Sequence, residues 1–168
     1  EKQNIYAMEK KFQYQIKENE VIITRTFEAS KEQVWNAFSD SNILDEWWAP
    51  KPWKCNTKSQ DFSVGGRWLY NMTGPNGEIH WSFMDYKEID PQNYYLGVDG
   101  FCDENGNPSK DIPSSTWRND FSFKDGQCTV TSSCTYDSAE TLKSYLDMGF
   151  LEGYEMGLNN LEALLKKQ

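Results

Sequence analysis

Few residues in this chain could perform acid–base chemistry together. His80 is the only histidine, and in the mouth of a pocket it could act as a general base. No serine or cysteine motif accompanies it, and strand alternation places it on the face opposite Trp81, so an inward Trp81 would leave His80 in solvent. Tyr70, Asp85 and Glu88 are the other acid–base candidates near the middle strands. Because the sequence contains no triad or paired-carboxylate pattern, we expect no catalytic residues and rank an enzyme below a binding protein.

Residue patterns for metal binding are equally sparse. No CxxC pair occurs among the four cysteines, which are Cys55, Cys102, Cys128 and Cys134. We therefore expect free thiols in a reducing cytoplasm rather than a zinc site. Asp103-x-Asn105-x-Asn107 resembles the start of a calcium loop, but its glycine comes too early and Ser114 replaces the bidentate glutamate. We interpret this segment as a hairpin turn, and the sequence predicts no metal and no cofactor.

Aromatic side chains are the main candidates for contact with a ligand. The 7 Trp, 9 Tyr and 9 Phe residues supply much large apolar surface to bury or to offer to a small molecule. We predict an apolar pocket with a few polar anchors. Its predicted lining is Trp48, Trp53, Trp68, Tyr70, Trp81, Phe83, Tyr95, Phe101, Trp117, Phe121, Tyr145, Gly149, Gly153 and Met156. Ordinary core packing is the alternative, and which face of each strand points inward stays open.

One long closing helix, predicted over Ser138–Lys167, would hold part of this lining. Gly149, Gly153 and Gly157 are spaced by four and align on one helix face, although each costs about 1 kcal/mol relative to alanine. This face either lies very close to another backbone or leaves room for a ligand. We favour the second explanation, because a filled core would use leucines there. Asn160 is a polar residue at the centre of the same face, and we expect it to form a structural hydrogen bond to the sheet rather than to contact a ligand.

A second apolar stripe on the closing helix suggests a partner surface. Leu151, Leu158 and Leu165 are spaced by seven on the back of the predicted helix. Such a stripe could pack on the loop of the short helices or on a second copy of the chain. The sequence thus allows a monomer or a homodimer.

The segments before the closing helix predict an antiparallel sheet. Ser30 and Gln33 form a capping-box pattern for a short helix over Lys31–Ser39, and Ser41 or Asn42 could cap a second one that ends near Trp48. The predicted strands cover Phe12–Ile16, Val21–Phe27, Trp53–Val64, Arg67–Thr73, Glu78–Ile89, Asn93–Cys102, Ser115–Lys124 and Gln127–Tyr136. This order predicts an α+β fold in which a curved sheet wraps around the long C-terminal helix.

Length and charge set further bounds. A chain of 168 residues is long enough for one domain with a real core, which we assign to residues 21–168. Residues 1–20 are assigned to an N-terminal extension that could add one extra strand. The formal net charge of −9 disfavours nucleic acid and anionic membranes as partners. No apolar run is long enough to span a bilayer, and no secretory leader is visible, so we expect a cytoplasmic protein.

Several motifs, in order along the chain, resemble START-like proteins of the SRPBCC superfamily. ITRTFEASKEQVWNAFSDSNILDEWWAPKPW, which begins at Ile23, is similar to the opening signature of the branch related to the activator of the heat-shock protein 90 ATPase. VGGRWLY (Val64–Tyr70) is similar to a second signature of that branch, and GPNGEIHW and FCDENGN resemble one bacterial subgroup. MGFLEGYEMGLNNLEALL (Met148–Leu165) is similar to the closing helix of the family.

This resemblance implies a helix-grip fold of about six to seven strands, with a cavity between sheet and helix. We expect a domain that binds a small apolar or aromatic molecule without catalysis. The alternative is a protein-interaction or stress module whose partner is a chaperone or another protein, as for the namesake of the branch. A polyketide cyclase-like enzyme is the third possibility that the superfamily implies, because fold alone does not settle function.

Overall fold

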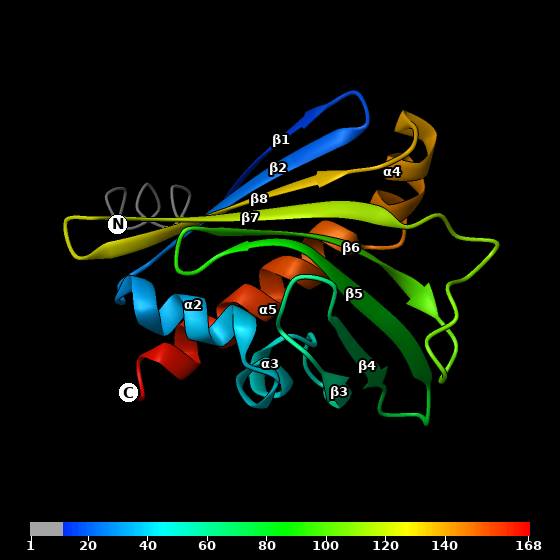
Figure 1. Ribbon diagram of the computed structural model, residues 1–168, viewed down its shortest axis with the longest axis horizontal. Coiled ribbons are helices and arrows are strands. Elements are labelled where there is room, and N and C mark those ends of the chain that lie inside the picture. The colour runs from blue at the N-terminus through cyan, green and yellow to red at the C-terminus, as the bar shows by residue number, and fades with distance from the viewer. Residues whose placement is uncertain (1–11) are drawn as a thin grey trace.

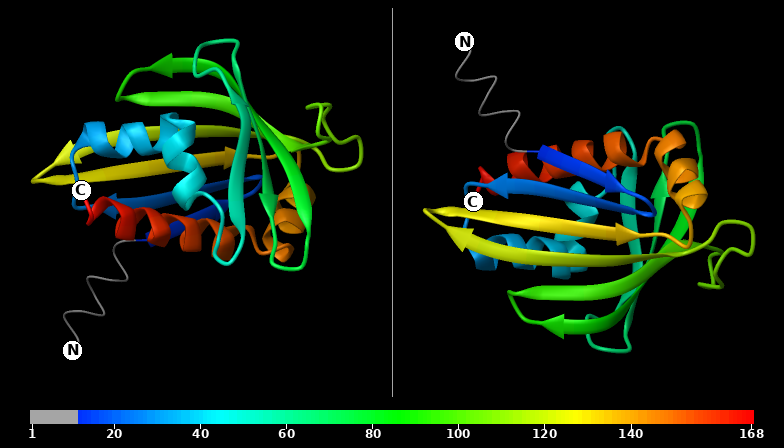
Figure 2. Two further views of the ribbon diagram at one scale, coloured as in Figure 1. Left: turned by 90° about the horizontal axis from the view of Figure 1, so that it is seen from below. Right: turned by 90° about the horizontal axis from the view of Figure 1, so that it is seen from above.

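Alternating apolar and polar residues form one curved antiparallel sheet. In the computed structural model, which describes residues 12–168, eight strands pair in the order β1-β2-β8-β7-β6-β5-β4-β3. The strands are β1 (Phe12–Lys17), β2 (Glu20–Phe27), β3 (Lys54–Gln60), β4 (Arg67–Thr73), β5 (Ile79–Asp90), β6 (Tyr94–Cys102), β7 (Ser115–Lys124) and β8 (Gln127–Thr135). The helices α2 (Lys31–Ser39), α3 (Ser41–Trp47) and α5 (Phe150–Leu165) lie on the concave face (Figure 1, Figure 2). This arrangement confirms the helix-grip fold, with slightly more strands than expected.

The first two predicted strands form a hairpin. β1 and β2 pair in register from Phe12–Arg25 to Lys17–Glu20, so β1 is an edge strand of the same sheet. The boundary proposed after residue 20 stays a prediction, and residues 1–11 of the expected extension lie outside the described residues.

Local capping fixes the two short helices. The Ser30 hydroxyl accepts a bond from the Gln33 backbone N–H (3.1 Å), and the Gln33 side chain accepts one from the Ser30 N–H (3.0 Å), which completes the predicted capping box of α2. The predicted cap of α3 at Ser41 or Asn42 is wrong. Asp40 is the cap, since its carboxylate accepts a bond from the Asn42 N–H at 2.9 Å. Asp40 also ends α2, so one residue joins the two helices without a longer loop.

The single closing helix predicted over Ser138–Lys167 is two helices. α4 (Ala139–Asp147) begins at the Ser138 cap and ends at Met148, and α5 starts after Gly149. Gly149 has a φ of 88°, the left-handed conformation that glycine adopts without the steric cost of a Cβ atom. Gly149 therefore interrupts the helix instead of lining a continuous helical face.

The buried face of α5 also differs from the predicted one. Leu158 and Leu161 are at most 1% exposed, and Leu165 is buried too, so two leucines of the predicted outer stripe lie in the core. A partner surface made of Leu151, Leu158 and Leu165 is therefore not available. Met156, expected in the pocket, is 45% exposed.

α5 crosses α3 closely at one point. A Cβ atom on Gly157 would lie 3.0 Å from the carbonyl oxygen of Trp48 and 3.3 Å from that of Trp47. Three residues further on, the Asn160 amide donates to the carbonyls of Trp47 (3.3 Å) and Ala49 (3.0 Å). The predicted structural hydrogen bond of Asn160 is thus present, but its acceptors lie at the end of α3 rather than on the sheet.

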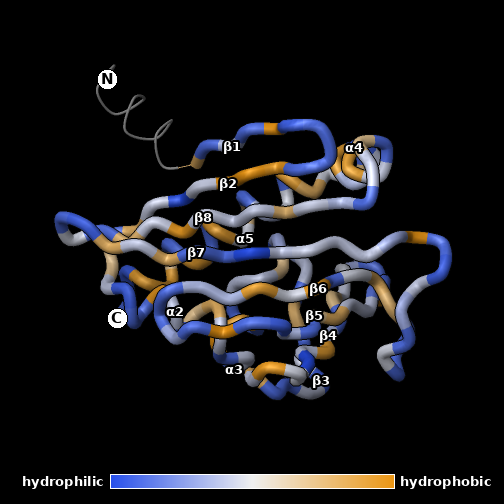
Figure 3. The backbone as a smooth tube through the Cα atoms, turned by 45° about the horizontal axis from the view of Figure 1, so that its top comes forward, coloured by the Kyte–Doolittle hydropathy of each residue, from blue (hydrophilic) through white to orange (hydrophobic). Residues whose placement is uncertain are grey.

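Polar residues are concentrated at the turns. The tips of the β1–β2 and β7–β8 hairpins are hydrophilic, whereas hydrophobic segments occur along β2, which has a buried inner face (Figure 3). One charged residue on that inner face is Arg25, whose guanidinium donates to Asn159 (2.8 Å) and Glu162 (3.1 Å) of α5. Within residues 12–168, no helix is both long and apolar enough to cross a membrane.

Candidate ligand-binding pocket

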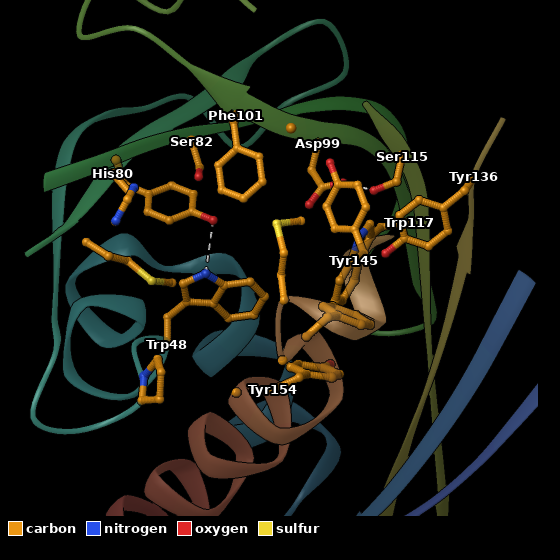
Figure 4. A pocket seen from close by; sticks show the side chains of 18 residues that line it. Trp48, His80, Ser82, Asp99, Phe101, Ser115, Trp117, Tyr136, Tyr145 and Tyr154 are labelled. Atoms are coloured by element: carbon orange, nitrogen blue, oxygen red, sulfur yellow. Dashed lines mark hydrogen bonds between the residues drawn. The ribbon is translucent and has the colours of Figure 1, made fainter. Parts of the chain in front are cut away.

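A pocket of about 250 Å³ opens between the concave face of the sheet and the α4–α5 junction. Strands β4 to β7 form one wall, and the segment that follows α3 forms another. The side chains and backbone around it belong to Trp48, Pro50, Tyr70, Met72, His80, Ser82, Asp99, Gly100, Phe101, Ser115, Trp117, Tyr136, Tyr145, Met148, Gly149, Phe150, Gly153 and Tyr154 (Figure 4). Most of this wall is aromatic or aliphatic, as ligand pockets usually are.

Trp48 lies at the centre of the aromatic wall. Its indole N–H donates to the Tyr70 hydroxyl at 3.0 Å, and its ring packs edge-on against Trp68 at 5.6 Å between centroids. The ring centroid of Trp117 lies 6.1 Å from that of Trp48. The indole nitrogen is therefore satisfied by the protein, and the rings are held in fixed positions around the pocket.

Tyr145 closes the outer end of the pocket from α4. Its hydroxyl donates to the Pro113 carbonyl at 2.8 Å, and its ring stacks on Phe101 at 6.1 Å with an interplanar angle of 17°. The ring centroid of Tyr136 lies 4.8 Å from that of Tyr145. These contacts tie α4 to the loop before β7 and to the end of β8.

A carboxyl group lies in the same wall. Asp99 on β6 faces the pocket and accepts a hydrogen bond from the Ser115 hydroxyl of the neighbouring strand (Figure 4). Burial raises the pKa of Asp99 to about 7, and the bond from Ser115 only partly opposes this shift. Burial is the main cause of the raised pKa of Tyr136 and Tyr145, and the negative charge of Asp99 raises both further.

A chain of buried hydrogen bonds holds Tyr154 in place beside the pocket. The Asn119 amide donates to the Tyr95 hydroxyl at 2.8 Å, and the Ser132 hydroxyl donates to the Asn119 carbonyl oxygen at 2.5 Å. Ser132 also lies 2.8 Å from the Tyr154 hydroxyl, and because its only proton is used, Tyr154 must be the donor. Tyr154 thus presents its ring to the pocket while its polar end is satisfied beneath it.

Gly153 contributes empty space to this site. A Cβ atom placed there would have only the Pro50 ring within reach, at 4.0 Å. This is ordinary contact distance, in contrast to the close approach at Gly157. The two explanations for the aligned glycines therefore both apply, but to different residues.

Half of the predicted lining residues border the pocket. They are Trp48, Tyr70, Phe101, Trp117, Tyr145, Gly149 and Gly153. The rest lie elsewhere: Trp53, Trp68, Trp81, Phe83, Tyr95, Phe121 and Met156.

Packing and strand register explain these departures. Tyr95 and Phe121 belong to the interior beneath α2, where both rings pack against Trp35. Trp68 lies behind Tyr70, stacked on it at 3.9 Å.

Trp53 stacks at a tilt beside His80, 5.4 Å away. Trp81 and Phe83 point to the convex side, under the side chains of Lys58 and Arg67 respectively.

That register brings other residues into the site. On β5 the inward face holds His80 and Ser82, so His80 borders the pocket and the face opposite to it carries Trp81. Asp99 was not predicted, although Tyr95 and Phe101 were, and alternation along β6 places Asp99 on the same face as both. That signal could have found it.

The remaining acid–base and metal candidates lie outside the pocket. Asp85 forms a two-point ion pair with Arg67 (2.6 and 3.0 Å), and Glu88 accepts from the Tyr94 hydroxyl at 3.0 Å. Asp103 accepts bonds from the N–H groups of Asn105 and Asn107, which is turn geometry. The four cysteines are free, and residues 12–168 contain no cluster of three or more potential metal ligands.

The chain is similar to a known protein family and to several solved structures. A family model described as Activator of Hsp90 ATPase homolog 1-like protein matches residues 28–166. The crystal structure of protein Ms6760 from Mycobacterium smegmatis is 34% identical, with a TM-score of 0.84 over 92% of this chain and 94% of that chain.

Two solution structures give similar matches. The Arthrobacter aurescens protein is 25% identical with a TM-score of 0.86, over 93% of this chain and 92% of that chain. The Staphylococcus epidermidis protein is 28% identical with a TM-score of 0.80, over 92% of this chain and 93% of that chain. Comparison with proteins of curated function gave no match.

Proposed function

Because the chain belongs to the Activator of Hsp90 ATPase homolog 1-like family, a helix-grip family, we propose that it is a binding domain for a small apolar or aromatic molecule. One observation carries this proposal: the pocket of about 250 Å³ between the sheet and the α4–α5 junction. Rings that the protein itself holds in place surround this space. A site built in this way favours an apolar ligand with few polar contacts.

The size of the pocket limits the ligand. A cavity of about 150 Å³ is known to admit benzene, and drug-sized ligands need roughly 300 Å³ or more. The pocket of about 250 Å³ therefore fits a molecule of about one or two rings. Larger lipids would extend into solvent through its open side.

The polar groups of the wall favour binding over turnover. Trp48 and Tyr70 bond to each other, and Tyr145 and Tyr154 bond to other parts of the protein. Their hydroxyl and indole groups therefore act as supports for the rings. Free and mostly buried thiols fit a reducing compartment, in keeping with a cytoplasmic location.

Native mass spectrometry of freshly purified protein tests the proposal. We expect a retained small molecule in the wild type and in Gly153→Ala, and its loss in Gly153→Leu, whose side chain would fill the space beside Pro50. Ligand-observed NMR with a panel of one-ring and two-ring compounds extends the test to weak binders. If neither method detects a molecule that binds the wild type and is lost in Gly153→Leu, the proposal fails.

A second candidate function is the binding of a chaperone or another protein. The description of the matching family, which names an activator of the Hsp90 ATPase, favours it. This candidate predicts that a chaperone co-purifies with the chain and is released by substitutions on its surface rather than by Gly153→Leu. If no chaperone co-purifies, this candidate is removed and the pocket proposal is unaffected.

A further inference from the structure

We propose that the ligand carries a basic amine, and that its ammonium group binds at Asp99 with its ring or chain in the aromatic part of the pocket. This inference rests on the proposed function and specifies its ligand class. It depends on three features of the wall: a carboxylate without a cationic partner, the rings around it, and the absence of lysine and arginine among the lining residues.

Asp99 has hydrogen-bond partners but no cationic one. The Ser115 hydroxyl donates to its carboxylate, and a backbone N–H also donates to it. The residues that line the pocket within the described chain include no lysine and no arginine. A half-buried carboxylate without a counter-charge is costly, and a ligand that supplies an ammonium group would reduce that cost.

Aromatic rings surround the carboxylate end of the pocket. Phe101, Trp117, Tyr136 and Tyr145 border the same end as Asp99 (Figure 4). The face of an aromatic ring carries partial negative charge and attracts cations, most strongly where water is excluded. A carboxylate beside several rings is therefore a site for a cation that also has apolar surface.

The negative charge of the wall disfavours ligands that carry an acid or an alcohol in place of the amine. Asp99 contributes to the raised pKa of Tyr70 as well as those of Tyr136 and Tyr145, so its negative potential extends across the pocket. An acidic ligand would be repelled, and a neutral alcohol would gain only a hydrogen bond. The net charge of −9 also raises the local concentration of cations at the surface.

A matched panel of ligands tests this assignment. The probes are 2-phenylethylamine, 2-phenylethanol and 3-phenylpropanoate, together with tryptamine, tryptophol and indole-3-propionate, each titrated by calorimetry at pH 7.5. We expect each amine to bind at least about tenfold more tightly than its alcohol, and each acid to bind most weakly. This order is measured on the wild-type protein and needs no variant.

Asp99→Asn keeps the shape and removes the charge. We expect it to lower amine affinity by about tenfold or more and to leave alcohol affinity within about threefold. Asp125→Asn is the matched control, because it makes the same charge change in the exposed turn between β7 and β8 and should alter neither.

Each outcome is decisive. If the alcohols bind as tightly as the amines, or if Asp99→Asn leaves the preference for amines intact, the amine assignment is wrong and the binding proposal stands. If no probe of any class binds and native mass spectrometry shows no retained molecule, the proposed function itself fails, and the amine assignment with it.

Discussion

Asp99 is a titratable group in a half-buried position, and its raised pKa affects the stability of the fold. The folded pKa of about 7 lies above the value of about 3.9 expected for an unfolded chain. Between these values the folded state binds more protons than the unfolded state, so this group lowers stability as pH rises from about 4 to about 7. The difference corresponds to at most about 4 kcal/mol.

Comparison of the wild type with Asp99→Asn isolates this effect. The neutral amide resembles the protonated carboxyl, so we expect the variant to match the wild type near pH 4 and to be more stable by up to a few kcal/mol at pH 8. Urea unfolding at several pH values measures the difference. The titratable groups within the field of Asp99 are tyrosines and a thiol with raised pKa values, which stay neutral throughout this range: Tyr70, Tyr95, Cys134, Tyr136 and Tyr145. A difference that is constant with pH would contradict the assignment.

Gly153 and Gly157 differ although both lie within α5. Alanine at Gly153 meets no atom closer than 4.0 Å, so we expect it to stabilise the protein by up to about 1 kcal/mol through helix propensity. Alanine at Gly157 would press on the Trp48 carbonyl at 3.0 Å, and we expect a net loss of about 1 kcal/mol because overpacking exceeds the propensity gain. Chemical denaturation of both variants gives the comparison, and equal effects would remove the distinction between open space and close contact.

At the level of elements, the break at Gly149 separates α4 from α5. An uninterrupted helix would carry residue 145 along the axis of α5, whereas the break lets Tyr145 reach Phe101 and Pro113. Alanine at Gly149 must adopt a φ of 88°, so we expect Gly149→Ala to cost about 1–2 kcal/mol and to weaken ligand binding.

Gly149→Asn is the control for that substitution, because asparagine tolerates the left-handed conformation better than alanine. Thermal unfolding should therefore rank the wild type first, Gly149→Asn second and Gly149→Ala last. A more stable Gly149→Ala protein would mean that α4 and α5 can form one continuous helix at no cost.

The sequence predicted those elements whose signals are local. The capping box of Ser30 and Gln33 defined α2, and alternation with turn residues located most strands to within a few residues. The break at Gly149 could not be recognised, because a glycine within a helical pattern looks the same whether its φ is negative or positive. Gly157 likewise needed knowledge of the α3 carbonyls, which come from a distant part of the chain.

The inward face of each strand was the harder problem. Alternation assigns Trp81 and Phe83 to one face of β5 and Ser82 and Met84 to the other, but it does not say which is inside. The aromatic residues suggested the wrong choice. Phe83 is 2% exposed although it points away from the pocket, because Arg67 covers it from the convex side.

At the scale of the whole molecule, the interior has two parts. Under α2, rings such as Trp35, Phe38 and Phe121 fill the space between helix and sheet. Toward the α4–α5 junction the interior is not filled, and the pocket opens there beside Gly153. The fold thus separates a packed core that provides stability from an open end that is suited to binding.

The indole N–H signals of the tryptophans provide the most direct test of a ligand in that open end. In two-dimensional ¹H–¹⁵N NMR spectra titrated with 2-phenylethylamine and, separately, with 2-phenylethanol, at least one probe should shift Trp48 and Trp117 saturably. Trp35 in the packed core and Trp81 on the convex side should stay unchanged, and Gly153→Leu should abolish the response. No saturable shift with either probe, or equal shifts at Trp81 and Trp48, would contradict the central claim that this pocket binds a small molecule.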